Sequence, residues 1–141
     1  MKANKLTPNL EVTNIRETIE FYQAFLDFSL VMAVPETQDG IEQTLADEKE
    51  YVYALVSKDR VEMMFQRTDS FKEDVPLAKD FSVGASVSFY MEIDGLDSFH
   101  EQIKSKGLTP TALKTAWYGM REFYLTDNNG YILGFAEKSA E

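Results

Sequence analysis

Two stretches of the sequence decide the fold: Leu10-Glu-Val-Thr-Asn-Ile15 and Met91-Glu-Ile-Asp-Gly-Leu96, which lie 81 positions apart (10 to 91). Each alternates apolar and polar residues like a strand and then passes directly into a helical pattern. A second matching pair, residues 56–65 and 126–135, lies 70 positions apart (56 to 126) and has the pattern strand, polar turn, strand. This internal repeat predicts two modules of similar structure within one chain.

The elements between these stretches complete each module. The first helix begins at Asn14, an N-cap residue, with Glu17 three positions later. The second helix ends at Gly107. We expect one further strand in each half, near residues 28–34 and 108–114. The sequence thus predicts an α+β fold of two βαβββ modules in a single domain, with module 1 at about residues 5–66, a linker at 67–84 and module 2 at about 85–138.

Composition excludes several classes of chemistry. The 141 residues include no cysteine and one histidine, His100, which excludes Cys-ligated zinc, iron–sulfur clusters and multi-histidine metal sites within one chain. We expect His100 on the surface of the second helix. Acidic residues outnumber basic ones by 24 to 14, and the acidic segment 35–50 is expected to form a long mobile loop or a short solvated helix.

The net charge of −10 bears on partners and location. A chain this acidic repels nucleic acid and anionic lipid, so neither is an expected partner, whereas cationic or neutral ligands are favoured. No apolar run approaches the ~20 residues of a membrane span, and residues 1–8 lack the apolar stretch of a signal peptide. We therefore expect a cytoplasmic protein.

The motifs resemble those of the glyoxalase/bleomycin-resistance/extradiol-dioxygenase superfamily, also called vicinal oxygen chelate proteins. The resemblance is carried in the first half by residues 12–22 and 26–28, and in the second by residues 118–123 and 127–131. It implies that the helices lie on the outer face of paired, half-barrel sheets. Asn128 stands where the family often has proline. Because this scaffold hosts many reactions, the resemblance implies a fold more strongly than a reaction.

The resemblance also implies where metal ligands would lie in the enzymes of this superfamily. The four positions hold Thr7, Met64, Ser88 and Gly134 in this sequence. None supplies a strong ligand for a divalent transition metal. The chain is therefore similar to the metal-free bleomycin-resistance type, and we expect no cofactor and no catalytic residue.

Strand alternation predicts which side chains face the central cleft. Tyr90 and Glu92 share the face of Ser88, and Glu62 shares the face of Met64, while the intervening residues are apolar. The predicted cleft is acidic with inserted aromatic rings, which suits a cationic ligand. The alternative is that these carboxylates simply end strands that face solvent.

Two aromatic residues precede a glycine in the second half: Trp117-Tyr118-Gly119. The resemblance implies a role in binding, because in bleomycin-resistance proteins an aromatic residue at this place stacks on the flat part of the drug. The alternative is a half-buried anchor for the hairpin. For the adjacent Arg121 and Glu122 we expect a satisfied ion pair rather than ligand contacts.

These observations lead to one function and two competitors. The first is a non-catalytic protein that sequesters a cationic, partly aromatic small molecule in clefts of a homodimer, through Trp117, Tyr118, Tyr90, Glu62, Glu92 and Met64. The second is a metal-dependent lyase or dioxygenase whose ligands lie elsewhere. The third is a regulatory or interaction domain with an empty cleft.

Overall fold

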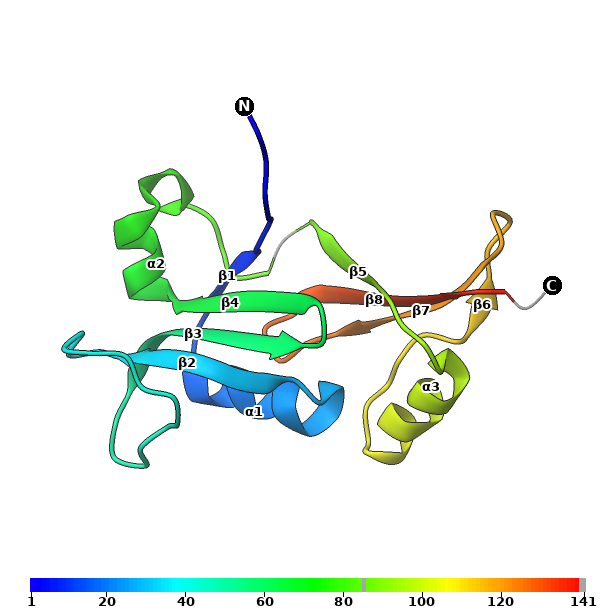
Figure 1. Ribbon diagram of the computed structural model, residues 1–141, viewed down its shortest axis with the longest axis horizontal. Coiled ribbons are helices and arrows are strands. Elements are labelled where there is room, and N and C mark those ends of the chain that lie inside the picture. The colour runs from blue at the N-terminus through cyan, green and yellow to red at the C-terminus, as the bar shows by residue number, and fades with distance from the viewer. Residues whose placement is uncertain (85, 140–141) are drawn as a thin grey trace. The chain divides into compact units, whose positions relative to one another are not determined.

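The computed structural model describes residues 1–84 and 86–139, which fall into two compact units, Met1–Val83 and Gly84–Glu141. Each unit has a four-stranded mixed sheet, and the order of the strands is the same in both: β1-β4-β3-β2 in the first and β5-β8-β7-β6 in the second. In each, the first strand pairs in parallel with the last, and the other pairs are antiparallel. The predicted repeat and the α+β class are confirmed (Figure 1).

The first unit contains seven elements. In chain order they are β1 (Asn9–Val12), α1 (Ile15–Leu26), β2 (Ser29–Pro35), β3 (Tyr51–Lys58), β4 (Val61–Arg67), α2 (Thr68–Asp74) and the 3₁₀ helix η1 (Pro76–Ala78). The segment 67–84, which we expected to link the modules, thus carries α2 and η1 and clusters with the first unit up to Val83.

The sequence of α1 explains both its start and its packing. Asn14 is the N-cap, as predicted, and its side-chain oxygen accepts a hydrogen bond from the backbone N–H of Glu17 at 2.9 Å. Ile15, Ile19 and Tyr22 lie on the buried face of the helix. The ring of Tyr22 lies 4.8 Å from that of Phe65 on β4, so α1 covers the face of the sheet to which Phe65 points.

The opposite face of the first sheet is covered at one end by α2 (Figure 1). Gln66 on β4 alternates with Phe65 and therefore points away from α1. Its amide nitrogen donates to Ser70 at 2.9 Å and to Asp74 at 2.7 Å, both on α2. The first sheet is thus enclosed by a helix on each side where β1 and β4 meet.

The acidic segment after β2 is an irregular loop without a helix. Arg16 on α1 donates to the carbonyl oxygens of Ala46 and Lys49 at 2.7 and 2.8 Å. Glu42 accepts a hydrogen bond from the Tyr51 hydroxyl at 2.7 Å and pairs with Lys49. Of the two expected alternatives, a loop and a short solvated helix, the structure has the loop, and side chains of α1 and β3 supply contacts that hold it.

The second unit contains β5 (Ser88–Glu92), α3 (Leu96–Ser105), β6 (Lys114–Thr115), β7 (Met120–Thr126) and β8 (Ile132–Lys138). The strand expected near residues 108–114 is only the two residues of β6. The turn between β7 and β8 is organised by Asp127, whose buried carboxylate accepts the backbone N–H groups of Asn129 and Tyr131 at 2.8 and 2.9 Å. Gly130 in this turn has φ +90°, which a glycine adopts without strain.

The helix α3 packs on one face of the second sheet. His100 is buried, its ring lies 4.8 Å from that of Phe123, and its Nε2 is 2.9 Å from the carbonyl oxygen of Thr111. The expectation of a surface histidine is therefore wrong: on a short helix, the face that carries Leu96 and Ile103 also carries position 100. None of the described helices combines the length and hydropathy that a membrane span requires.

Candidate functional site

The face of the second sheet opposite α3 collects tyrosine and glutamate side chains. On β7, Phe123 and Leu125 are buried on the side of α3, so Glu122 and Tyr124 point to the other side. The register then aligns residues across three strands in two rows: Tyr90, Gly134 and Tyr124, and next to it Glu92, Ala136 and Glu122. We call the following group the tyrosine face: Tyr90, Glu92, Tyr118, Glu122 and Tyr124, above Gly134 and Ala136.

Glu122 is the centre of the tyrosine face. It is 8% exposed, and its carboxylate accepts a hydrogen bond from the Tyr90 hydroxyl at 2.7 Å. The Tyr118 hydroxyl donates to the same carboxylate, at 2.8 and 2.9 Å from its two oxygens. One carboxylate therefore fixes two rings that come from β5 and from the turn before β7.

The hydroxyl groups of these two tyrosines remain protonated well above neutral pH. Desolvation, followed by the hydrogen bond to Glu122, raises the pKa of Tyr90. The hydrogen bond to Glu122 is the main reason why the pKa of Tyr118 is raised. Both hydroxyls thus donate hydrogen bonds to the Glu122 carboxylate and fix its position.

Gly134 gives the rings room to lie over the sheet. A Cβ atom at this position would lie 2.8 Å from Cε1 of Tyr124 and 3.3 Å from Cδ1 of Tyr90. The two rings therefore approach the backbone of β8 from both neighbouring strands. Position 134 is one of the four that hold metal ligands in the enzymes of the family that the sequence resembles. Here it has no side chain, so the backbone of β8 lies directly beneath the two rings.

The charge of the tyrosine face is not neutralised by an ion pair within the described residues. Arg121 binds Asp97 on α3, with nitrogen–oxygen distances of 3.0 and 2.9 Å. The expected Arg121–Glu122 pair is therefore wrong, because consecutive strand residues point to opposite faces. Lys114 is the cross-strand partner of Glu122, yet it is exposed and forms no ion pair there.

Trp117 lies beside this face, in the turn between β6 and β7. The backbone N–H of Ala116 donates to Met120 and that of Gly119 to Ala116, and Gly119 has φ +92°, so the turn is tight. The indole is 96% exposed and contacts the Tyr118 ring edge-on, with centroids 5.4 Å apart. It contributes little to the packing of its own unit and is available to a ligand.

The six residues predicted to bind ligand are divided between the two units. Tyr90, Glu92, Trp117 and Tyr118 belong to the second unit, where Glu122 links Tyr90 to Tyr118. Glu62 and Met64 share one face of β4 in the first unit, where Glu62 pairs with Lys5 and Met64 is half-buried.

Sequence reasoning missed Glu122 and Tyr124 as members of this group. The signal that could have found them is the alternation along Met120–Thr126, where Phe123 and Leu125 are the core-facing residues. The contact of Tyr118 with Glu122 could not be found in this way, since it depends on how the turn folds back over β7.

The corresponding face of the first unit is polar, and side chains of α2 contact it. The Glu11 carboxylate, which is buried, lies 3.6 Å from the Lys72 ammonium on α2. Asn9 donates to the side-chain oxygen of Gln66 at 2.9 Å, and Gln66 in turn donates to α2. Side chains of α2 thus satisfy polar groups on this face.

The residues at the family's metal positions do not fit a divalent transition metal. Met64 and Gly134 lie on the last strands of their units, and Ser88 begins β5. With Thr7 they offer hydroxyls and a thioether, but no carboxylate or imidazole. Across residues 1–84 and 86–139, no group of three His, Cys, Asp or Glu side chains is placed to hold a metal ion.

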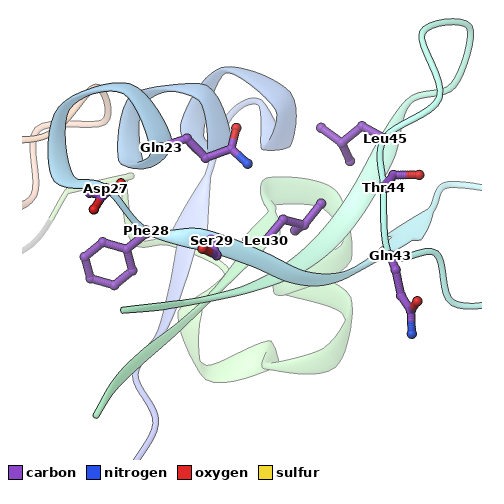
Figure 2. A pocket seen from close by; sticks show the side chains of 8 residues that line it. All are labelled: Gln23, Asp27, Phe28, Ser29, Leu30, Gln43, Thr44 and Leu45. Atoms are coloured by element: carbon purple, nitrogen blue, oxygen red, sulfur yellow. The ribbon is translucent and has the colours of Figure 1, made fainter. Parts of the chain in front are cut away.

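A shallow hollow of about 550 Å³ lies elsewhere, in the first unit. Figure 2 shows it between the end of α1, the start of β2 and the loop at Gln43, Thr44 and Leu45. Its one carboxylate, Asp27, binds Lys58 at 3.3 Å. None of the six residues predicted to bind ligand lines this hollow.

Comparisons with known proteins agree with this architecture. A bleomycin resistance protein of Geobacillus stearothermophilus is 25% identical over 133 residues, which cover 93% of this chain and 94% of the relative. A solved glyoxalase/bleomycin resistance protein/dioxygenase from Nocardioides is 14% identical, with a TM-score of 0.72 and coverage of 99% of this chain and 86% of that one. The solved bleomycin-binding protein of Streptomyces verticillus, complexed with copper(II)-bleomycin, is 18% identical, with a TM-score of 0.59 and coverage of 100% and 99%.

The match to a family model extends over most of the chain. Residues 6–135 match the Glyoxalase/Bleomycin resistance protein/Dioxygenase superfamily. This range includes both four-stranded sheets up to Phe135 in β8, so the match is to the whole repeated architecture. The chain belongs to the Glyoxalase/Bleomycin resistance protein/Dioxygenase superfamily, and it is similar to bleomycin resistance proteins within it.

Proposed function

We propose that this protein binds and sequesters a cationic, partly aromatic small molecule without transforming it. The observation that carries the proposal is the tyrosine face, where a buried carboxylate, an exposed carboxylate and three tyrosine rings lie beside an exposed tryptophan. Carboxylates attract a cation, and ring faces add a cation–π attraction of ~0.5–2 kcal/mol. Relatives described as bleomycin resistance proteins support a role in holding such a compound.

Four of the proposed ligand contacts belong to this surface: Tyr90, Glu92, Tyr118 and the adjacent Trp117. Glu62 and Met64 remain proposed contacts on the first unit. The hydroxyls of Tyr90 and Tyr118 donate to Glu122 and have a raised pKa, so they are poor nucleophiles at neutral pH. Sequestration needs affinity alone, and this arrangement supplies charge and flat apolar surface for it.

The direct test is a titration with metal-free bleomycin. Because Trp117 is the only tryptophan, its emission reports on the turn beside the tyrosine face. We expect the emission to be quenched or shifted on binding. A ligand at 100 times its dissociation constant stabilises the fold by ~2.7 kcal/mol, which a thermal-shift measurement detects. A titration series of bleomycin and other planar cations with no change in either signal would refute the proposal.

Metal independence is part of the same proposal. It is supported by the residue types at positions 7, 64, 88 and 134. Treatment with a chelator is expected to leave the melting temperature unchanged. A fall of several degrees that Ni²⁺, Zn²⁺ or Fe²⁺ reverses, or about one divalent metal per purified chain, would instead favour a metal-dependent lyase or dioxygenase.

We also propose that the protein is a homodimer. Each sheet is open, with β1 and β2 at the edges of the first and β5 and β6 at the edges of the second. Among the described residues, β2 has one further bridge at its outer edge, from Ala33 to Glu42. Unpaired edges and an uncovered sheet face favour association, and C2 symmetry is the commonest solution. Light scattering at micromolar concentration should give twice the 16.1 kDa of one chain. A mass of one chain would contradict the dimer.

A further inference from the structure

The internal repeat relates the two sheet faces residue by residue. Glu11 precedes Glu92 by 81 positions, the spacing of the first strands, and both lie at equivalent places on β1 and β5. Glu11 is paired with Gln66 in the register of its sheet, and Glu92 is paired with Ala136, which follows Gln66 by 70 positions. The chemical group that the chain places beside Glu11 therefore indicates which kind of group can bind at the equivalent position, Glu92.

In the first unit, the chain places an ammonium group of its own on this face. Lys72 on α2 has its Nζ 3.6 Å from the Glu11 carboxylate. The same nitrogen donates to the carbonyl oxygens of Ala78 and Phe81, at 2.8 and 2.7 Å. The ammonium is thus held by one carboxylate and two further oxygen acceptors, which matches the three N–H donors of a lysine.

In the second unit, the same face has the acceptors but no such cation among its described residues. Glu92 is exposed and forms no ion pair with any residue of the described part of the chain, and Glu122 lies two strands away in the same row, across Ala136. Glu122 is 8% exposed, and among the described residues its hydrogen-bond donors are tyrosine hydroxyls, which do not compensate its negative charge as a cation would. The only helix of this unit's described part, α3, packs on the opposite face.

The tyrosine rings add a surface for the body of a ligand. Tyr90 and Tyr124 lie over Gly134, next to the row that holds the two carboxylates. A carboxylate has about four acceptor positions, and the hydroxyl groups of Tyr90 and Tyr118 occupy some of those on Glu122. The positions that remain on Glu92 and Glu122 can be filled by N–H donors, which a quaternary ammonium lacks.

We propose that the tyrosine face binds a primary amine in its ammonium form, with the N–H donors directed to Glu92 and Glu122 and an aromatic body lying on the rings of Tyr90 and Tyr124. The inference rests on the proposed function, because it concerns the same surface, and it names the chemical group that the surface selects. Lys72 on Glu11 is the counterpart of this ligand within the chain.

Three matched probes test the selection on the full chain by calorimetry. They are 1-naphthylmethylamine, the neutral 1-naphthalenemethanol and the trimethylated quaternary form of the amine. At neutral pH and low salt, we expect the primary amine to bind at least tenfold more tightly than the alcohol and severalfold more tightly than the quaternary form. Equal affinity of amine and alcohol for the unaltered chain would overturn the inference, and this comparison requires no variant.

Two substitutions test whether Glu122 and Glu92 cause the preference for the amine. Glu122→Gln keeps an acceptor for the tyrosine hydroxyls and removes the charge, so we expect the amine-to-alcohol ratio to fall at least threefold. Glu92→Gln changes an exposed side chain and provides the same test if the Glu122 variant does not fold. We expect it to lower the amine-to-alcohol ratio at least threefold. Glu101→Gln on α3 is the matched control and should leave the ratio unchanged. A ratio that survives both changes on the tyrosine face would refute the assignment.

Parallel titration with metal-free bleomycin separates the two proposals. If bleomycin binds while the probes show no preference for the amine, the inference is wrong and the proposed function stands. If the amine preference depends on Glu122 while bleomycin and the other planar cations do not bind, the inference stands and the proposed function is wrong. If no compound binds, both are wrong.

Discussion

Replacement of Trp117 by alanine separates a ligand contact from a structural anchor. An indole side chain has about 250 Å² of surface, and at 96% exposure it buries only about 10 Å² within its own chain. At about 25 cal/mol per Å² of apolar surface, this burial stabilises the fold by only about 0.3 kcal/mol. We therefore expect Trp117→Ala to change the free energy of unfolding by less than about 0.5 kcal/mol.

The same substitution should have a larger effect on binding. A planar ligand that covers half of the indole removes about 125 Å² of it from water, a gross gain of about 3 kcal/mol before the entropic costs of binding. We expect Trp117→Ala to weaken bleomycin binding by at least about 1 kcal/mol, roughly a fivefold rise in Kd measured by calorimetry. Trp117→Phe, which keeps a ring, should lose less. Unchanged affinity together with a loss of more than about 1 kcal/mol in urea unfolding would show that the residue anchors the hairpin.

Three further expectations concern contacts inside one unit or the other. Glu137→Ala removes the carboxylate that accepts the backbone N–H groups at the start of α3, at 3.0 and 3.1 Å, and should lower the free energy of unfolding by about 1 kcal/mol in urea titration; a loss no larger than that of the neighbouring Lys138→Ala would contradict this role. Asp127→Ala leaves two backbone donors of the turn without their acceptor and should cost about 1–3 kcal/mol, whereas Asp127→Asn keeps an acceptor oxygen and should cost less; equal costs would refute this account. The hydrogen bond from Lys49 lowers the pKa of the Glu42 carboxyl from 4.5 in the folded protein. The contribution of this carboxylate to the free energy of unfolding is therefore complete above pH 4.5 and is lost as the pH falls through the lower pKa of the folded state. A carboxyl NMR titration with a midpoint at or above 4.5 would contradict this.

Local pattern predicted most of the architecture. The alternation in residues 10–15 and 91–96 marks β1 and β5, and Asn14 is the N-cap of α1 as expected. These features were readable because they depend on residues within a few positions of one another, where strand alternation and capping act. The repeat extended this reading to the whole chain, because two similar sequences form two sheets with the same strand order.

Other features could not be read locally. His100 was expected at the surface, but the approach of Phe123 and of the Thr111 carbonyl buries it. The acidic segment after β2 was expected to be a mobile loop or a short helix; it is a loop, and Arg16, 30 positions before Ala46, contributes to holding it. In both places the decisive contact comes from a distant residue, whose position depends on tertiary packing.

The sequence by itself determined the two βαβββ modules, the acidic character of the chain and the residue types at the four metal positions, because these follow from short-range patterns and from composition. Only the tertiary structure decided that Glu122 gathers Tyr90 and Tyr118, and that Lys72 lies on Glu11. The physical reason is that such groups join strands, a turn and a helix that the sequence separates. Their side chains meet only after strand register and helix packing have fixed each backbone in place.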